Sequence, residues 1–175
     1  MPRPSIDDIR SIGDVATLYR WNVDFVSFPT ALAGPPTTES LNLRAETTEM
    51  PKRTGQSIET LIRGHKVKQP GIYDYGNVLT MTFVETVDSV IANFMRNWRE
   101  ICSETRTGIA QNKVDVEATI LITRLNNLDE SIWEYKLVGC FLEDMEAGGT
   151  LDGQSSDSIK PSLTFSYDYF EDRPL

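Results

Sequence analysis

The chain has 175 residues, which is enough for one domain with a single hydrophobic core. Hydrophobic residues make up 39% of the sequence and charged residues 25%, a composition typical of a globular protein and too apolar for a disordered one. Asp and Glu number 26 against 17 Lys and Arg, which gives a formal net charge of −9. This acidity argues against a protein that grips nucleic acid through its phosphates and against peripheral binding to anionic membranes.

The first residues contain no apolar core of a signal peptide, and the best apolar run, residues 137–142, is far shorter than the ~18 residues of a membrane helix. We therefore expect neither a secretory signal nor a membrane anchor. Cys102 and Cys140 are expected to be buried, reduced thiols. Together with His65, the single histidine, they are too few for a structural zinc site, so we expect no metal and no cofactor.

The first half of the chain alternates between apolar and polar residues in several short stretches. A weak helical pattern covers residues 5–19, and Trp21, Val23 and Phe25 mark a half-buried strand. Residues 29–40, with Gly34-Pro35-Pro36, are a loop by composition. Alternation resumes at residues 41–45, a turn is predicted at 52–55, and strands are predicted at 56–68 and 78–85 with a break at Pro70-Gly71.

One segment has a strong helical period. Apolar residues recur at steps of three and four from Val87 to Cys102, with Phe94 and Trp98 among them, and charged residues lie opposite. This pattern predicts a core-facing helix over residues 87–106 that ends at Thr107-Gly108.

The last third again has the pattern of strands. Residues 114–123 alternate, residues 128–131 form a turn, and a strand from Trp133 to Leu142 is apolar on both faces. A loop at 148–158 precedes a closing strand at 163–169. About seven strands and one long helix, in the order β-β-β-β-α-β-β-β, exclude a doubly wound parallel sheet. We predict a mainly β single domain over residues 1–175, an antiparallel barrel or sandwich with one flanking helix.

No catalytic constellation is present in the sequence. His65 lies in a basic stretch and is expected to be solvated or at an interface. Asp115 and Glu117 are two residues apart in a predicted strand, which is the pattern of a solvated face and not of an acid–base pair. We therefore expect no enzyme.

Charge is distributed unevenly along the chain. Residues 50–70 contain one acid, Glu59, and five bases: Lys52, Arg53, Arg63, Lys66 and Lys68. Residues 140–175 contain eight acids against Lys160 and Arg173. Two interpretations stay open: chance combined with solubility, or a basic patch on one copy that meets an acidic patch on the next in a head-to-tail contact.

Five segments in this order resemble the T4-like tail tube proteins of contractile-tailed phages, whose fold is shared with the tubes of contractile injection systems and of type VI secretion. The segments are the opening strand at 19–25, residues 46–51 before a basic turn, residues 62–71 with Pro70-Gly71, residues 79–83 leading into the helix with Trp98, and the aromatic–acidic strand at 163–171. The resemblance covers roughly residues 19–172.

The resemblance implies a β-barrel protomer with a flanking helix that forms homohexameric rings, with strands joined edge to edge, stacked into a hollow tube. It implies a virion tail assembled in the host bacterial cytoplasm, with a sheath protein, a baseplate or tube initiator, a tail terminator and a tape measure protein as partners. DNA would pass through the lumen without specific binding, and the protein would have no membrane anchor. The alternatives are the tube protein of a contractile injection particle, a baseplate tube initiator, and, outside this class, a ligand-binding β-barrel with Trp133, Tyr135 and Phe141 around a cavity.

The resemblance also implies two sets of functional residues. Polar faces of inner strands would line the bore, with a solvated outer face as the alternative, at Arg44, Glu46, Glu59, Asp115, Glu117 and Glu134. Contacts between subunits and rings would involve an inter-ring loop at residues 50–56 and the side chains of Met50, Pro51, Lys52, Arg53, Lys66 and Lys68. No role is assigned to the N-terminal arm, residues 1–18, or to the exposed loop at 30–40.

Overall fold

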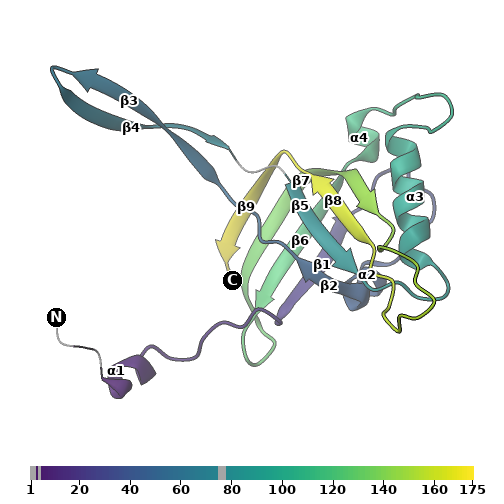
Figure 1. Cartoon of the computed structure of the whole chain (residues 1–175), viewed down its shortest axis with the longest axis horizontal. Helices are drawn as coiled ribbons and strands as arrows, with labels where there is room; N and C mark the ends of the chain where they lie inside the picture. The colour runs from purple at the N-terminus through teal and green to yellow at the C-terminus, as the bar shows by residue number, and fades with distance from the viewer. Residues whose placement is uncertain (1–2, 4, 75–77) are drawn as a thin grey trace.

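The computed structural model describes residues 3, 5–74 and 78–175. Two antiparallel four-stranded sheets share one long strand, β7 (Ser131–Glu146). The first sheet has the order β1-β6-β7-β9, with β1 (Trp21–Ser27), β6 (Ala118–Leu125) and β9 (Tyr169–Pro174). The second sheet has the order β2-β5-β8-β7, with β2 (Ala45–Thr48), β5 (Val78–Phe83) and β8 (Ser162–Ser166). Figure 1 shows the two sheets as one curved body.

Strand β7 passes from the first sheet to the second at Gly139. This glycine has φ +71°, and a Cβ there would lie 2.3 Å from Oδ2 of Asp168. The Asp168 N–H donates to the Val138 carbonyl at 3.0 Å, where the chain turns from β8 into β9. A side chain at position 139 would therefore clash at the corner that both sheets share.

The core lies between the sheets and under α3 (Val90–Cys102). Trp98 is fully buried, contacts the rings of Phe25 and Phe165, and donates from Nε1 to the Val116 carbonyl at 2.9 Å. One helix residue thus ties together a strand of each sheet and the segment before β6. This explains why the strongest helical pattern in the sequence is also the element that closes the body.

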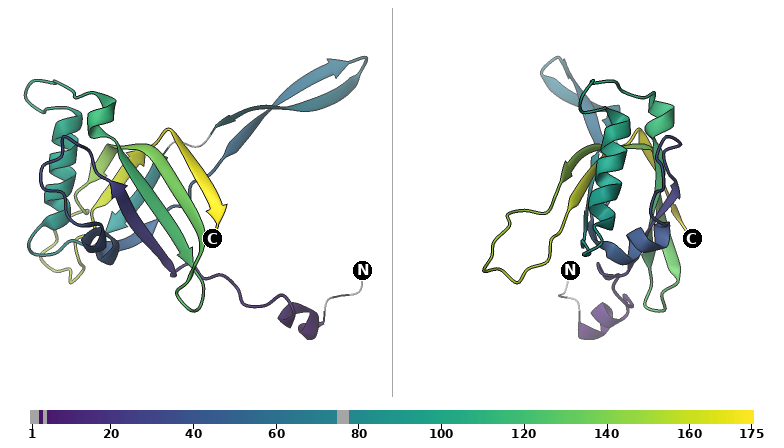
Figure 2. Two further views of the ribbon diagram at one scale, coloured as in Figure 1. Left: turned by 180° about the vertical axis from the view of Figure 1, so that it is seen from behind. Right: turned by 90° about the vertical axis from the view of Figure 1, so that its right-hand side faces the viewer.

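Two segments project from this body (Figures 1 and 2). The hairpin of β3 (Thr54–Ile62) and β4 (His65–Asp74) forms a separate two-stranded sheet, and apart from the half-buried Gly71 its side chains are exposed. The N-terminal arm carries the short helix α1 (Ile6–Arg10). Neither segment contributes to the core, so neither is held by burial within one copy of the chain.

The prediction of a mainly β antiparallel fold with a flanking helix is confirmed, and α3 lies inside the predicted range of 87–106. Residues 41–45, however, were wrongly predicted as a strand. They belong largely to the helix α2 (Thr38–Arg44), in which Thr37 accepts the Ser40 N–H at 3.2 Å and Leu41 is buried. The predicted exposed loop at 30–40 therefore ends in a helix, and Leu32 within it is buried.

Several further element predictions were wrong in detail. The single strand at 56–68 is a hairpin that turns at Arg63 and Gly64, both with positive φ, and Pro70-Gly71 lies inside β4. Residues 113–116 form one helical turn, α4 (Lys113–Val116), so the strand expected from 114 begins at Ala118. The closing strand is split into β8 and β9, and the predicted loop at 50–56 is shortened because β3 begins at Thr54. Within the described residues, no helix is long and apolar enough to cross a membrane.

Candidate interaction surfaces

The hairpin has one charged face. Glu59 lies opposite Lys68 across the two strands, and its carboxylate forms ion pairs with Lys66 and, at 3.1 Å, with Lys68. The pKa of the Glu59 carboxyl is held below its ordinary value, chiefly by the hydrogen bond from Lys66 and next by the one from Lys68. Arg63 at the tip adds a further exposed cation. This face therefore remains basic after its one acid is paired.

The other face of the hairpin is mixed, because three aliphatic side chains lie there opposite Gln69, Thr60 and His65. Ile58, Ile62 and Val67 alternate with the charged residues, and between 44% and 57% of each side chain is exposed. A projecting two-stranded sheet with exposed aliphatic side chains is marginal by itself in water. Such a surface is typical of a segment that is buried against another protein.

Arg53 fixes the root of the hairpin to its own chain. Its guanidinium forms an ion pair with Asp172 at 2.6 Å, donates to the Phe170 carbonyl at 3.4 Å and lies 4.5 Å from the centre of the Phe170 ring. Lys52, one residue earlier, is exposed. The two neighbouring cations thus differ: Arg53 anchors β9 and Lys52 faces solvent.

The edge of β1 is closed by side chains of α2. The Val23 N–H donates to Oδ1 of Asn42 at 2.8 Å, and the Phe25 N–H donates to Oγ1 of Thr38 at 2.8 Å. β1 pairs with β6 along its other edge. Two N–H groups that could otherwise donate to a neighbouring strand are therefore already hydrogen-bonded within the chain.

The second sheet ends in β2 on one side and in residues 141–146 of β7 on the other. β2 is its terminal strand, and no described strand pairs with its outer edge. At the other end, the pairing of β6 with β7 stops at Ala118 and Cys140, so within the described residues the segment 141–146 pairs only with β8. The Leu142 N–H is hydrogen-bonded to the Cys102 thiol of α3. Both end strands of this sheet thus retain edge positions without a strand partner in the described part of the chain.

Each sheet has one face that points away from the core, and these two outer faces differ in charge. On the second sheet the hydroxyl oxygens of Thr80 and Thr164 are 3.3 Å apart. The acids Asp144 and Glu146 lie opposite Thr164 and Ser162 on the neighbouring strand. The strand positions on this face are Thr47, Val78, Thr80, Thr82, Ser162, Thr164, Ser166, Phe141, Asp144 and Glu146. They include hydroxyls and acids but no base. The corresponding face of the first sheet carries bases as well, because Lys136 lies opposite Glu171.

The six predicted bore residues do not lie together. Glu134 is on the first sheet, paired with Arg173 at 3.0 Å, and Glu46 is on β2, paired with Lys160 at 2.5 Å. Arg44 ends α2, where it bonds Ser40. The remaining three are Glu59 on the hairpin, Asp115 in α4 and Glu117 at the end of α4. Asp115 and Glu117 were placed on an alternating strand that the structure replaces with a helical turn, so the alternation argument fails for them; the role itself stays a prediction.

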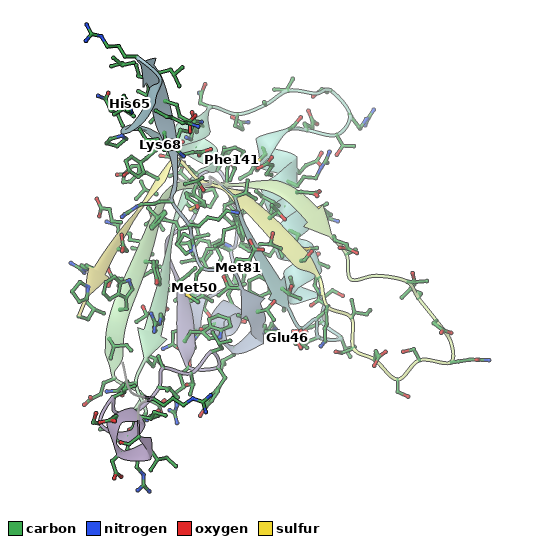
Figure 3. The ribbon with its side chains drawn as sticks, turned by 60° about the vertical axis from the view of Figure 1, so that its left-hand side comes forward. Glu46, Met50, His65, Lys68, Met81 and Phe141 are labelled. Carbon is green, nitrogen blue, oxygen red and sulfur yellow. The ribbon has the colours of Figure 1, made fainter. Side chains whose placement is uncertain are left out.

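The predicted contact residues lie on the hairpin or in the segment that leads into it. Lys66 and Lys68 lie on β4, while Met50, Pro51, Lys52 and Arg53 lie between β2 and the root of the hairpin. In Figure 3, Lys68 and the solvent-exposed His65 are on the projecting hairpin, whereas Met50 and Glu46 lie on the body. Sequence reasoning found the basic residues of this element but not the detached hairpin that carries them.

Burial raises the pKa of the Cys140 thiol to about 12 and also raises that of the half-buried Cys102, so both are protonated and poor nucleophiles at neutral pH. In the described part of the chain no group of His, Cys, Asp and Glu residues is arranged to hold a metal ion. Phe141 lies opposite Ser166 on the face away from the core, whereas Tyr135 pairs with the buried Ile122, so the three predicted cavity aromatics do not surround one cavity.

Sequence reasoning missed Thr38 and Asn42, which cap β1. Their spacing of four residues fits one face of a helix, but this signal depends on first identifying α2 as a helix.

No family model and no curated protein matches the chain. Several solved structures do. The PVC extracellular contractile injection system sheath/tube terminator superposes with a TM-score of 0.65 at 12% identity, over 93% of this chain and 99% of that chain. The tube-terminating cap of the anti-feeding prophage superposes with a TM-score of 0.63 at 14% identity, over 94% of this chain and 98% of that chain. A chain of the PVC sheath–tube complex superposes with a TM-score of 0.60 at 15% identity, over 98% of this chain and 99% of that chain.

The chain has the fold of these tube and terminator proteins. The resemblance found in the sequence is thereby confirmed at the level of the fold. The finer assignment, to the T4-like phage proteins within this fold, stays a prediction.

Proposed function

We propose that the protein is a structural subunit whose copies close into rings and stack into a hollow tube. The observation that carries the proposal is the second sheet, a four-stranded antiparallel sheet whose two end strands retain edge positions without a strand partner in the described residues. Exposed strand edges are a liability in a monomer but are the means of assembly in a ring. The fold shared with contractile tube and terminator proteins supports the same reading.

The order of the strands suits closure into a ring. Each strand of the second sheet is antiparallel to the next, so its end strands β2 and β7 run in opposite directions. β2 of one copy placed beside residues 141–146 of the next copy would continue the antiparallel pattern. Such a contact is heterologous and generates a closed ring when the rotation between copies closes.

We place the bore on the face of the second sheet that carries Thr80, Thr164, Asp144 and Glu146. A tube must let its contents slide, and every base in contact with a phosphate would add salt-dependent affinity. A face of hydroxyls and acids without a base meets this requirement for an anionic passenger. Of the residues predicted from the sequence, Glu46 lies on the strand that ends this sheet.

The finer proposal is a virion component, a phage tail tube of stacked homohexamers that conducts the viral genome during ejection without binding it. A sheath protein, a tube initiator, a tail terminator and a tape measure protein would be its partners, and assembly would occur in the host cytoplasm. The net charge of −9 per copy, repeated around a ring, supports passage of DNA rather than retention. The same geometry serves an injection particle that carries an effector.

A second candidate function is a ring that ends a tube. Two of the similar structures are a terminator and a terminating cap, which favours this candidate by fold alone. The two functions differ in stacking: a tube subunit stacks on both faces of its ring, and a terminator on one.

Negative-stain electron microscopy of the purified protein tests both candidates. Long tubes with a central channel support the tube subunit, and single rings that do not stack support the terminator. A protein that stays monomeric at concentrations of about 10⁻⁴ M, where weak interfaces with dissociation constants in the micromolar range are filled, contradicts both.

A further inference from the structure

The hairpin is tied to a sheet to which its flanking strands do not belong. The chain enters the hairpin from β2 and continues after it to β5, and both are strands of the second sheet. Arg53, the residue before β3, instead contacts Phe170 and Asp172 of β9, the end strand of the first sheet. The hairpin leaves the body beside this strand (Figures 1 and 2). Its direction therefore depends on a contact between elements that are far apart in the sequence.

Three interactions hold the Arg53 guanidinium in place. Its Nη2 lies 2.6 Å from Oδ1 of Asp172 and donates to the Phe170 carbonyl at 3.4 Å, and the guanidinium carbon is 4.5 Å from the centre of the Phe170 ring. The Phe170 side chain is buried in the core, so this partner is rigid. The Asp172 side chain is 26% exposed, against 41% for Glu59 in the ion pairs of the hairpin, so solvent and salt screen the Arg53 pair less.

No comparable contact restrains the rest of the hairpin. Residues 55–73 form no hydrogen bond or ion pair with the body in the described part of the chain. Where β4 approaches β9, an open cleft is lined by Arg53, Tyr73, Tyr169 and Phe170. The angle of the hairpin to the body is therefore set at its root, where Arg53 reaches a buried side chain of β9.

We infer that Arg53 acts within its own chain, as the residue that sets the direction in which the hairpin leaves the body. The sequence predicted Arg53 as a contact between subunits or rings. In the positioning role it favours stacking without touching the next copy, because a hairpin that is ordered in advance loses less entropy on association. The inference rests on the proposed ring assembly and replaces one contact residue of that assembly with a positioning residue.

Distances between spin labels in the disassembled subunit test the positioning role. The labels are attached at Thr60→Cys on the hairpin and Glu143→Cys on the body, in a Cys102→Ser background, because the other cysteine is buried. We expect double electron–electron resonance to give a distance distribution about twofold broader for Arg53→Met than for the natural sequence, because the root loses its contact with β9. Lys52→Met, which removes the neighbouring exposed cation, is the matched control and should leave the width unchanged.

Assembly of paired variants tests the contact between Arg53 and Asp172. We expect Arg53→Met and Asp172→Ala each to raise the protein concentration needed for assembly about twofold to fivefold, the size expected for a partly exposed ion pair. The double variant should be no worse than either single variant, because both substitutions remove the same contact. Glu171→Ala, an exposed acid on the opposite face of β9, is the control. Either single variant carries the test if the other does not fold by circular dichroism.

Failure of this inference can be told apart from failure of the proposed function. If the natural protein forms no rings, the proposed function fails, and the distance measurement on the single subunit still decides whether Arg53 positions the hairpin. The inference is overturned if Arg53→Met leaves the distance distribution as narrow as in the natural protein. It is also overturned if Arg53→Met weakens assembly and Asp172→Ala does not, because Arg53 then acts on the next copy and not on its own chain.

Discussion

Glu85 supplies the N-terminal cap of α3 from outside the helix. Ser89, at the N-cap position, has a left-handed backbone (φ 55°) and makes no side-chain cap. The Glu85 carboxylate instead accepts the N–H groups of Ile91 at 3.2 Å and Ala92 at 2.6 Å. A negative charge at this end of a helix also interacts favourably with the helix dipole. A single side chain therefore stabilises the helix that closes the core.

We expect Glu85→Ala to lower the free energy of unfolding by about 0.5–2 kcal/mol, the range measured for loss of a helix cap. Glu85→Gln keeps an acceptor oxygen and should lose less. Urea denaturation followed by circular dichroism measures both, with Glu143→Ala, an exposed acid on β7, as the control. A Glu85→Ala protein as stable as the control would show that the cap contributes nothing.

At the scale of elements, the hairpin is a separate two-stranded sheet held by its own strand pairing and by Arg53 at its root. Because its side chains are exposed, the ion pairs of Glu59 are screened by solvent and salt and shape the surface more than they stabilise the fold. In the proposed assembly they would present a fixed arrangement of cations to a second copy of the chain. The pairing also makes a specific prediction about pH.

The pKa of the Glu59 carboxyl is held below the ordinary 4.5 of a glutamate. Because the folded-state pKa is lowered, the ion pairs are fully formed above pH 4.5 and are lost as the pH falls through the lowered pKa. An NMR titration of the Glu59 carboxyl carbon should give a midpoint below 4.5. Lys66→Met with Lys68→Met should return it to the ordinary value, and an unchanged midpoint in this variant would contradict the assigned cause.

Two elements show why short patterns mislead. Leu41, Leu43 and Ala45 alternate as in a strand, yet Thr37 caps a helix there and only Leu41 is buried. Val114 and Val116 also alternate, but the chain makes one helical turn before β6. Over four to seven residues each period includes only two or three apolar positions, so alternation alone does not separate a strand from a short helix. The 13-residue α3, in contrast, was predicted correctly because its pattern extends over more than three turns.

At the scale of the whole molecule, the charge asymmetry of the sequence becomes a spatial one. Three of the five bases, Arg63, Lys66 and Lys68, project on the hairpin together with Glu59 and Asp74, while Asp144 and Glu146 lie on the body at the end of β7. We expect Lys52→Glu with Arg63→Glu to raise the concentration needed for assembly about threefold to tenfold at low salt, because two rim contacts change sign.

Light scattering against protein concentration measures this effect. Arg96→Glu with Arg106→Glu, two exposed bases outside the hairpin, makes the same change of net charge and should have a smaller effect. Equal effects of the two double variants would assign the loss to net charge and remove the hairpin from the interface.

The placement of the bore is tested by access to single cysteines. In a Cys102→Ser background, where the remaining Cys140 is buried with a pKa of about 12, Asp144→Cys marks the second sheet and Glu171→Cys the first. In assembled tubes, a small maleimide should react at both positions, and a maleimide on a long polymer only at position 171. The reverse pattern would place the first sheet around the bore.

The sequence by itself determined the secondary-structure class, the antiparallel order and the core helix around Trp98, because these follow from composition and from long periodic segments. It also indicated the basic and acidic regions. Only the tertiary structure decided that residues 54–74 leave the body as a hairpin, that β7 serves two sheets through Gly139, and that Thr38 and Asn42 close β1. These features depend on which strands meet and which edges remain, and partners distant in sequence leave no local pattern from which to predict them.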